Sequence, residues 1–148
     1  MRKLTWMAFL FVSLSLLSTS ISAQSSAETK PKKFENPQWK TLVMIDYLPG
    51  KYARAKEIIQ NYFMKAGQKA GTSTPLMQAQ AVTGEWDLVL VWEMKGGISD
   101  MDWDISPDNI KWRAALNEIT GSEEKTKELQ KEYSSLVNRS TSFILKSM

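Results

Sequence analysis

The stretch from Leu76 to Met94 constrains the fold of this chain more than any other. Two apolar runs lie on either side of Thr83-Gly84, and a glycine at that point is typical of a tight turn. We therefore predict a β-hairpin with a two-residue loop, in which Gln80 lies opposite Asp87. A single hairpin is only marginally stable in water, so the rest of the chain must supply elements that cover it.

The predicted register gives the hairpin two different faces, because residues that lie opposite each other share a face. The first face is apolar, and we assign it to the helices: Met77, Ala79, Ala81, Trp86, Leu88, Leu90 and Trp92. The second face is mixed, with valines near its centre: Gln78, Gln80, Val82, Asp87, Val89, Val91 and Glu93. A one-residue bulge would exchange the faces of half of the hairpin.

The segments around the hairpin predict a βαββαβ order, which is that of the ferredoxin-like motif. They are a strand at 39–48, a helix at 51–70, the hairpin, a helix from Ser106-Pro107 to about Thr120, a helix from Ser122 and a last strand at 139–146. The predicted fold class is α+β, with a four-stranded antiparallel sheet and helices on one face. The motif places the last strand beside the first, followed by the third and then the second.

The amino terminus has the three-part layout of a secretory signal peptide. Arg2 and Lys3 form a charged start, residues 4–17 are mostly apolar, and small polar residues lead to a cleavage site after Ala23. Residues 24–38 predict a flexible linker, followed by one domain at 39–148. An uncleaved anchor is the alternative, although a membrane span needs roughly 20 apolar residues. Both interpretations place the domain outside the cytoplasm, in the periplasm or secreted.

Charge and composition argue against several classes of function. The chain has 19 basic and 16 acidic residues, and removal of Arg2 and Lys3 with the signal peptide leaves 17 against 16, a net charge of +1. This balance gives little support for binding to nucleic acid or a membrane surface. The chain has no cysteine, and its lack of histidine excludes histidine-ligated haem and Ser-His-Asp catalysis. We expect no cofactor.

The predicted sheet is apolar on the side that the helices do not cover. The first strand has Val43, Ile45 and Tyr47 on one side, and Leu42, Met44 and Leu48 on the other. A strand that is apolar on both sides is covered on both faces. Since the helices cover only one face, we predict a homodimer in which a second copy of the sheet covers the other.

The hairpin sequence VTGEWDLVLV, residues 82–91, carries a resemblance to known proteins. It is similar to the Gly-x-aromatic-Asp hairpin of ligand-sensing domains of the Lrp/AsnC type and of small stress-responsive barrel proteins. With the element order, residues 39–148 resemble the dimeric α+β-barrel group of ferredoxin-like proteins. That group includes cofactor-free monooxygenases, haem-handling enzymes and amino-acid sensors, so the resemblance implies a fold without fixing a function. The absence of histidine separates this chain from the histidine-dependent members.

Asp46 and Asp87 are the candidate catalytic pair. The predicted topology places the end of the first strand beside the start of the third, so that both carboxylates reach the face that closes the barrel. A partly buried carboxylate there would have a raised pKa and would accept a proton from an acidic substrate, while Gln78 and Gln80 orient a ligand. The alternatives are structural: Asp87 bonds backbone N–H groups of the hairpin, and Asp46 pairs with a Lys or Arg across the dimer.

The segment around Trp103 contains a further candidate. Trp103 either covers the mouth of a ligand pocket or packs onto the domain. Asp100, Asp102 and Asp104 match the start of an EF-hand calcium loop, but Ile105 stands where that loop needs glycine. The sequence therefore predicts a ligand contact here and no metal site.

Taken together, these features favour an exported small-ligand-binding or sensing protein without catalysis. A cofactor-free enzyme of the monooxygenase or isomerase type, with Asp46 or Asp87 as its base, is the second hypothesis. A structural protein-interaction domain is the third. A pocket bordered by both aspartates would favour the enzyme, whereas a barrel packed solid with apolar side chains would exclude both ligand-based hypotheses.

Overall fold

The computed structural model describes residues 30–147. The predicted signal peptide, residues 1–23, lies outside the described residues, as does the first part of the predicted linker. A compact unit begins at Phe34 and includes every described helix and strand. Within residues 30–147, no helix is both long and apolar enough to cross a membrane.

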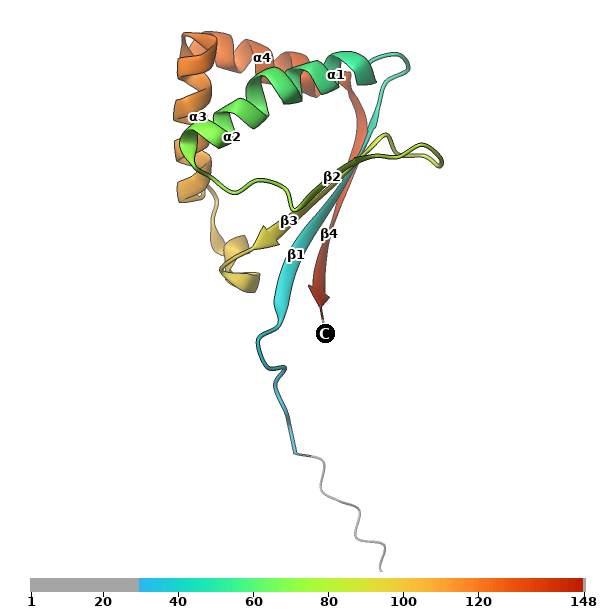
Figure 1. Cartoon of the computed structure of the whole chain (residues 1–148), viewed down its shortest axis with the longest axis vertical. Helices are drawn as coiled ribbons and strands as arrows, with labels where there is room; N and C mark the ends of the chain where they lie inside the picture. The colour runs from blue at the N-terminus through green and yellow to red at the C-terminus, as the bar shows by residue number, and fades with distance from the viewer. Residues whose placement is uncertain (1–29, 148) are drawn as a thin grey trace, which may run out of the picture. The chain divides into compact units, whose positions relative to one another are not determined.

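The helices and strands of this unit follow the predicted βαββαβ order, with two helices in the place of the second one (Figure 1). They are β1 (Gln38–Tyr47), α1 (Tyr52–Ile58), the π-helix η1 (Ile59–Phe63), α2 (Met64–Ala70), β2 (Met77–Gln80), β3 (Leu88–Met94), the 3-10 helix η2 (Gly97–Asp102), α3 (Pro107–Thr120), α4 (Glu123–Leu136) and β4 (Val137–Ser147).

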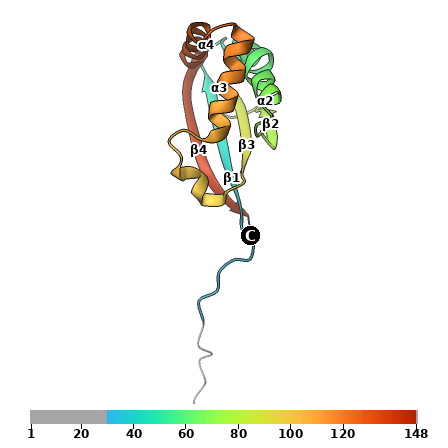
Figure 2. The same cartoon turned by 90° about the vertical axis from the view of Figure 1, so that its left-hand side faces the viewer.

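The four strands form one antiparallel sheet in the order β2-β3-β1-β4, which is the strand order expected from the sequence. The helices lie on one side of this sheet, and α3 crosses in front of it in Figure 2. The predicted α+β class with a four-stranded antiparallel sheet is confirmed. The other side of the sheet, which we call the open face, is covered by no described element.

The alternation of side chains along the strands determines which residues are buried. Val43, Ile45 and Tyr47 of β1, and Leu88 and Leu90 of β3, share the face that packs against the helices. Their helical partners in the core are Ala55, Ile58, Ile59, Ala66, Ala115, Leu116, Leu129 and Leu136. Burial of this apolar surface holds the helices onto the sheet.

One continuous helical stretch, made of α1, η1 and α2, contacts both of the later helices. α1 lies against α4, and α2 lies against α3. In η1 the hydrogen bonds span five residues, as shown by the N–H of Met64, which donates to the carbonyl oxygen of Ile59. Ile58, at the end of α1, and Ile59, at the start of η1, are both buried.

Local signals determine where α3 and α4 begin and end. The Oγ of Ser106 accepts a hydrogen bond from the N–H of Asn109 at 3.1 Å, and Pro107 occupies the first helical position. Gly121 ends α3 with φ of 92°, in the left-handed region that favours glycine. Ser122 then caps α4 in the same way as Ser106 caps α3. The predicted starts of both helices are confirmed.

The predicted register of the hairpin is wrong by one residue. Gln80 pairs with Leu88 instead of Asp87, and residues 81–87 form a loop in place of a two-residue turn. The cause is a set of bonds between Asp87 and β1: its N–H donates to the carbonyl oxygen of Ile45, and its carboxylate accepts from the N–H of Tyr47, both at 2.9 Å. Because β1 holds Asp87, the turn is longer than the Thr-Gly signal predicts.

This shift exchanges the two faces of β2 but not those of β3. Met77 and Ala79 belong to the open face, and Gln78 and Gln80 belong to the helix side. Val82, predicted near the centre of the mixed face, lies in the loop and is 89% exposed. The open face is therefore more apolar than the sequence predicts.

A pair of tyrosines in the core makes the free energy of unfolding depend on pH. The hydroxyls of Tyr47 and Tyr133 are hydrogen-bonded at 2.8 Å. Burial, and then this hydrogen bond, raise the pKa of Tyr47 above its ordinary value of 10.0. Burial also raises the pKa of Tyr133, against the opposing effect of the same hydrogen bond. The folded state favours the neutral form of both tyrosines. Their contribution to the free energy of unfolding is therefore fully present below pH 10.0 and falls as the pH rises above that value.

We expect the free energy of unfolding to fall above about pH 10, with a slope of about 1.4 kcal/mol per pH unit from Tyr47 alone. Urea denaturation at several pH values measures this slope. Tyr47→Phe removes the titrating hydroxyl. The slope of its unfolding free energy against pH should therefore be smaller than that of the unmodified protein by about 1.4 kcal/mol per pH unit. Two parallel profiles would contradict the assignment.

Candidate ligand-binding site

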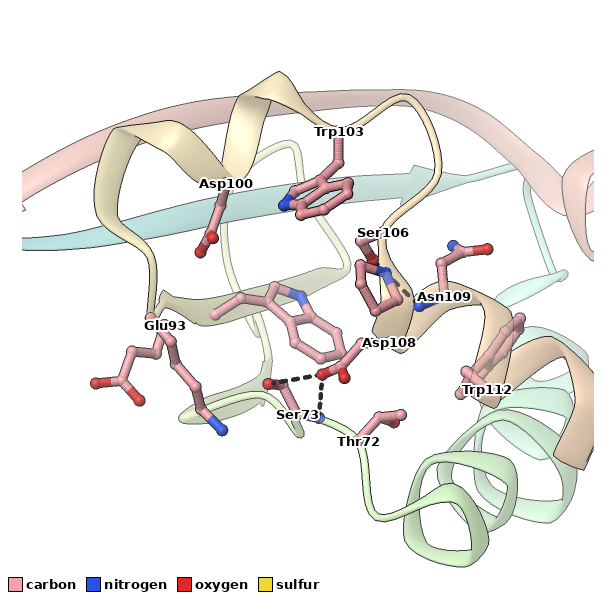
Figure 3. A pocket seen from close by; sticks show the side chains of 12 residues that line it. Thr72, Ser73, Glu93, Asp100, Trp103, Ser106, Asp108, Asn109 and Trp112 are labelled. Carbon is pink, nitrogen blue, oxygen red and sulfur yellow. Dashed lines mark hydrogen bonds between the residues drawn. The ribbon is translucent and has the colours of Figure 1, made fainter.

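An open pocket lies beside the start of α3 (Figure 3). Its volume is about 590 Å³, which is within the range of small-ligand sites. Its lining comes from four segments of the chain: Thr72 and Ser73 after α2; Trp92, Glu93 and Lys95 around the end of β3; Asp100 and Trp103 in and after η2; and Ser106, Pro107, Asp108, Asn109 and Trp112 around the start of α3. Half of the six tryptophans of the chain therefore meet here, and we call Trp92, Trp103 and Trp112 the pocket tryptophans.

Trp112 forms the fixed wall of the pocket. Its indole N–H donates to the carbonyl oxygen of Phe63 at 3.0 Å, and the two rings meet edge-on with their centroids 5.5 Å apart. Phe63 packs edge-on against Tyr133 in turn, at 5.0 Å between centroids. Because the hydrogen bond satisfies the only polar atom of the indole, the remainder of Trp112 offers apolar surface to the pocket.

Trp103 lies at the mouth of the pocket. It follows η2 and is 57% exposed. Figure 3 shows its ring above the cavity, across from Asp108. The structure therefore places Trp103 at the mouth of a pocket, which is one of its two predicted positions. The pocket is on the helix side of the sheet, not on the open face where the ligand was expected.

Two aspartates hold the loops that carry the pocket. The Oδ2 of Asp108 accepts from the N–H and the Oγ of Ser73, at 3.3 and 3.4 Å, which joins the segment after α2 to the start of α3 (Figure 3). The Oδ2 of Asp100 accepts from the N–H of Gly96 at 3.0 Å and closes the turn after β3. A Cβ at Gly96 would collide with this carboxylate, so the close approach depends on glycine. Within residues 30–147, no acidic cluster is arranged to hold a metal ion.

Asp46, half of the candidate catalytic pair, lies outside the pocket. Its Oδ2 accepts hydrogen bonds from Asn138 at 2.7 Å and from Arg139 at 3.2 Å. Arg139 also binds the carboxylate of Glu85 at 2.9 Å and lies over the ring of Trp86, 4.6 Å from its centroid. Asp46 therefore pairs with an arginine of its own chain, at the edge of the open face.

Gln78 and Gln80 do not share a face with Asp46, and Asp87 uses its carboxylate within the sheet. The carboxylate of Asp87 accepts the N–H of Tyr47 and so extends the pairing of β1 with β3. Gln78 and Gln80 are exposed on the helix side of β2, an edge strand, whereas Asp46 belongs to the open face. The predicted arrangement of two glutamines and two aspartates on one face is thus absent from the described chain.

Sequence reasoning missed most of the pocket. Residues 92–112 contain three tryptophans and four aspartates, and this concentration is a signal that could have pointed to it. Thr72 and Ser73 carry no such signal, because only the packing of α2 against α3 brings them to the start of α3.

Comparisons with known proteins give a structural likeness only. No protein-family model matches the chain, and no curated protein matches its sequence. A NIPSNAP family protein of unknown function from Agrobacterium tumefaciens aligns with a TM-score of 0.47 and 12% identity, over 74% of this chain and 87% of that one. A second NIPSNAP family protein from that bacterium gives 0.49 and 12%, over 80% and 92%. An uncharacterized NIPSNAP-like domain protein from Burkholderia xenovorans gives 0.47 and 13%, over 78% and 88%. A likeness at this level carries no argument about function.

Proposed function

We propose that the protein is exported and binds a small ligand in the tryptophan-lined pocket without catalysing a reaction. The observation that carries this proposal is the convergence of the three pocket tryptophans on one cavity of about 590 Å³. Ligand sites are typically concave and largely apolar, with a few polar groups that orient the ligand. The pocket has this composition, and the signal-peptide layout of residues 1–23 supports export.

The walls of the pocket are held before any ligand arrives. Trp112 is fixed by its hydrogen bond to Phe63, and Asp108 ties the start of α3 to Ser73. A pocket that is already in place spends little binding free energy on ordering side chains. Trp103, in contrast, is largely exposed, and a ligand beneath it would cover its apolar surface.

The positions of Asp46 and Asp87 favour binding over the enzyme hypothesis. Neither residue lines the pocket, and both already accept hydrogen bonds from their own chain, Asp46 from Arg139 and Asp87 from Tyr47. A general base must lie within hydrogen-bond reach of the proton that it removes. A ligand in the pocket would have neither carboxylate beside it.

A screen of diverse small molecules tests the proposal. A compound that fills the pocket is expected to change indole fluorescence and to raise the thermal unfolding midpoint, since a ligand at a hundred times its Kd adds about 2.7 kcal/mol of stability. Trp103→Ala should weaken binding at least about fivefold, because stacking on an aromatic ring contributes about 1 kcal/mol beyond the area that it buries.

Met101→Ala is the matched control for that substitution. Met101 is exposed on η2, close in sequence to Trp103, and does not line the pocket. Its replacement should leave the affinity unchanged. A screen in which no compound binds, or in which every binder is indifferent to Trp103→Ala, would contradict a role for the pocket.

The open face of the sheet supports a second part of the proposal, a homodimer in which the open faces of two chains pack against each other. One apolar residue from each strand stands in a continuous row across it: Met77 of β2, Val91 of β3, Leu42 of β1 and Phe143 of β4. Within a single chain Met77 and Phe143 are exposed. A row of this kind resembles the apolar centre of a protein interface.

Charged residues lie at both ends of the open face. Lys40 and Glu93 are paired in register at one end, and Asp46 and Arg139 are paired at the other. An apolar centre with a charged rim is typical of interfaces between proteins. Because each end carries both signs, a two-fold pairing of two copies can bring opposite charges together. This pattern favours a second copy of the chain as the partner.

A further inference from the structure

The three pocket tryptophans differ from the other tryptophans of the domain in their relation to cations. Lys146 lies 5.8 Å from the ring centroid of Trp39, and Arg139 lies 4.6 Å from that of Trp86. Within the described part of the chain, no lysine or arginine lies over a pocket tryptophan. A tryptophan face attracts cations through its negative quadrupole. The pocket therefore presents cation-binding surfaces that no lysine or arginine among residues 30–147 occupies.

The charge around the pocket has the sign that attracts a cation. The pocket lining has three acidic residues and one lysine, a formal charge of −2: Glu93, Asp100 and Asp108 against Lys95. Figure 3 shows Asp100 and Asp108 on different sides of the cavity, while Glu93 points away from it. Two carboxylates in a pocket that indoles also line add direct charge attraction to the attraction of the rings.

The start of α3, which lines the pocket, is not an anion-binding site. A helix amino terminus binds anions through its unpaired N–H groups and its dipole. Here Pro107 has no N–H, the N–H of Asn109 donates to the Oγ of Ser106, and that of Ile110 donates to the carbonyl oxygen of Ser106. The carboxylate of Asp108 in the first turn also offsets the dipole. An anion would find few donors at this end of the helix.

We infer that the pocket binds a small organic cation, an alkylated ammonium group held between indole faces and the carboxylates of Asp100 and Asp108. The inference rests on the proposed binding function and specifies the ligand class. The ammonium carbons pack on the rings, and the positive charge is shared between the ring faces and the carboxylates. Since neither aspartate uses all of its acceptor positions in the bonds to Gly96 and Ser73, both can also face a cation.

Titration with choline and with its neutral isostere 3,3-dimethylbutan-1-ol tests the ligand class, because the two differ only in the charged nitrogen. Fluorescence and calorimetry of the purified protein are expected to show choline binding about tenfold more tightly than the alcohol. Trp103→Leu, which keeps apolar surface but removes the ring, should reduce choline affinity about tenfold. Asp108→Asn should also reduce it, and Lys95→Gln should increase it, because Lys95 is the only cation in the lining that residues 30–147 form.

Several outcomes would overturn the cation assignment. They are equal affinity for choline and the alcohol, no choline binding at all, and weaker choline binding after Lys95→Gln. The small-molecule screen separates this failure from a failure of the proposed function. If neutral or anionic compounds bind and Trp103→Ala abolishes their binding, the pocket is a ligand site of another class. If no binder depends on Trp103, both proposals are wrong.

Discussion

Phe143→Glu is expected to dissociate the proposed homodimer into monomers. Phe143 lies in the central row of the open face and is 48% exposed in the single chain, so its replacement should disturb the fold little. In the proposed dimer both copies of Phe143 are buried. Loss of two such side chains removes at least about 3 kcal/mol, which raises the dissociation constant of the dimer about a hundredfold. Burial of two glutamate charges weakens the dimer further.

Size-exclusion chromatography with light scattering measures the mass of the assembly directly. Ser142→Glu is the matched control, because Ser142 is adjacent to Phe143 and exposed but belongs to the helix side of β4. It introduces the same charge and should remain dimeric. An unmodified protein that is monomeric at all concentrations, or a Phe143→Glu variant that is still a dimer, would show that the open face is not the dimer interface.

Leu116→Ala is expected to lower the free energy of unfolding by about 2–5 kcal/mol. Leu116 lies on α3 and has 0% of its surface exposed, so the substitution leaves a cavity between α3 and the rest of the core. The same helix carries Asp108 and Trp112 to the pocket. A loss of this size approaches the total stability of many domains, and the variant should therefore also bind pocket ligands less well near its unfolding midpoint.

Urea denaturation of the two proteins gives the difference in unfolding free energy. Ile110→Ala provides a control on the same helix, since Ile110 is 61% exposed and its truncation should change stability by no more than about 0.5 kcal/mol. If Leu116→Ala and Ile110→Ala cost the same, α3 does not pack on the core through Leu116.

Local chemistry made part of the fold predictable. Ser106, Pro107 and Gly121 determine the limits of α3 through a cap, a fixed backbone angle and a left-handed terminus, and each signal acts over a few residues. The α+β class follows equally from the periodicity of the strands and helices. The hairpin register was not predictable in this way, because Asp87 bonds to Ile45 and Tyr47, about forty residues away.

The candidate site was harder to predict than the fold. Trp103 is a predicted ligand contact because of its place in a loop, and in the structure it lines the pocket. Asp46 and Asp87 are the predicted catalytic pair because acids near an interior face often serve as bases. Each proves to bond to its own chain, to Arg139 and to the backbone of Tyr47, and neither partner was visible from sequence spacing.

The π-helix η1 gives the first helical stretch two different orientations. A π-helical turn contains about one residue more than an α-helical turn, and successive residues of an α-helix are about 100° apart. The extra residue rotates α2 relative to α1 by roughly that angle. α1 can thus face α4, while Ala66 and Gly67 of α2 are buried and α2 contacts α3.

In terms of the coding sequence, η1 holds about one residue, and so one codon, more than an ordinary helix with the same number of turns. Deletion of that codon would keep the length of the sheet and the order of the elements, but it would rotate α2 out of phase with α3. The contact between Phe63 and Trp112 would be lost with it. Two chains of the same fold, one with this pocket and one without, can therefore differ by one residue in a segment that does not line the pocket.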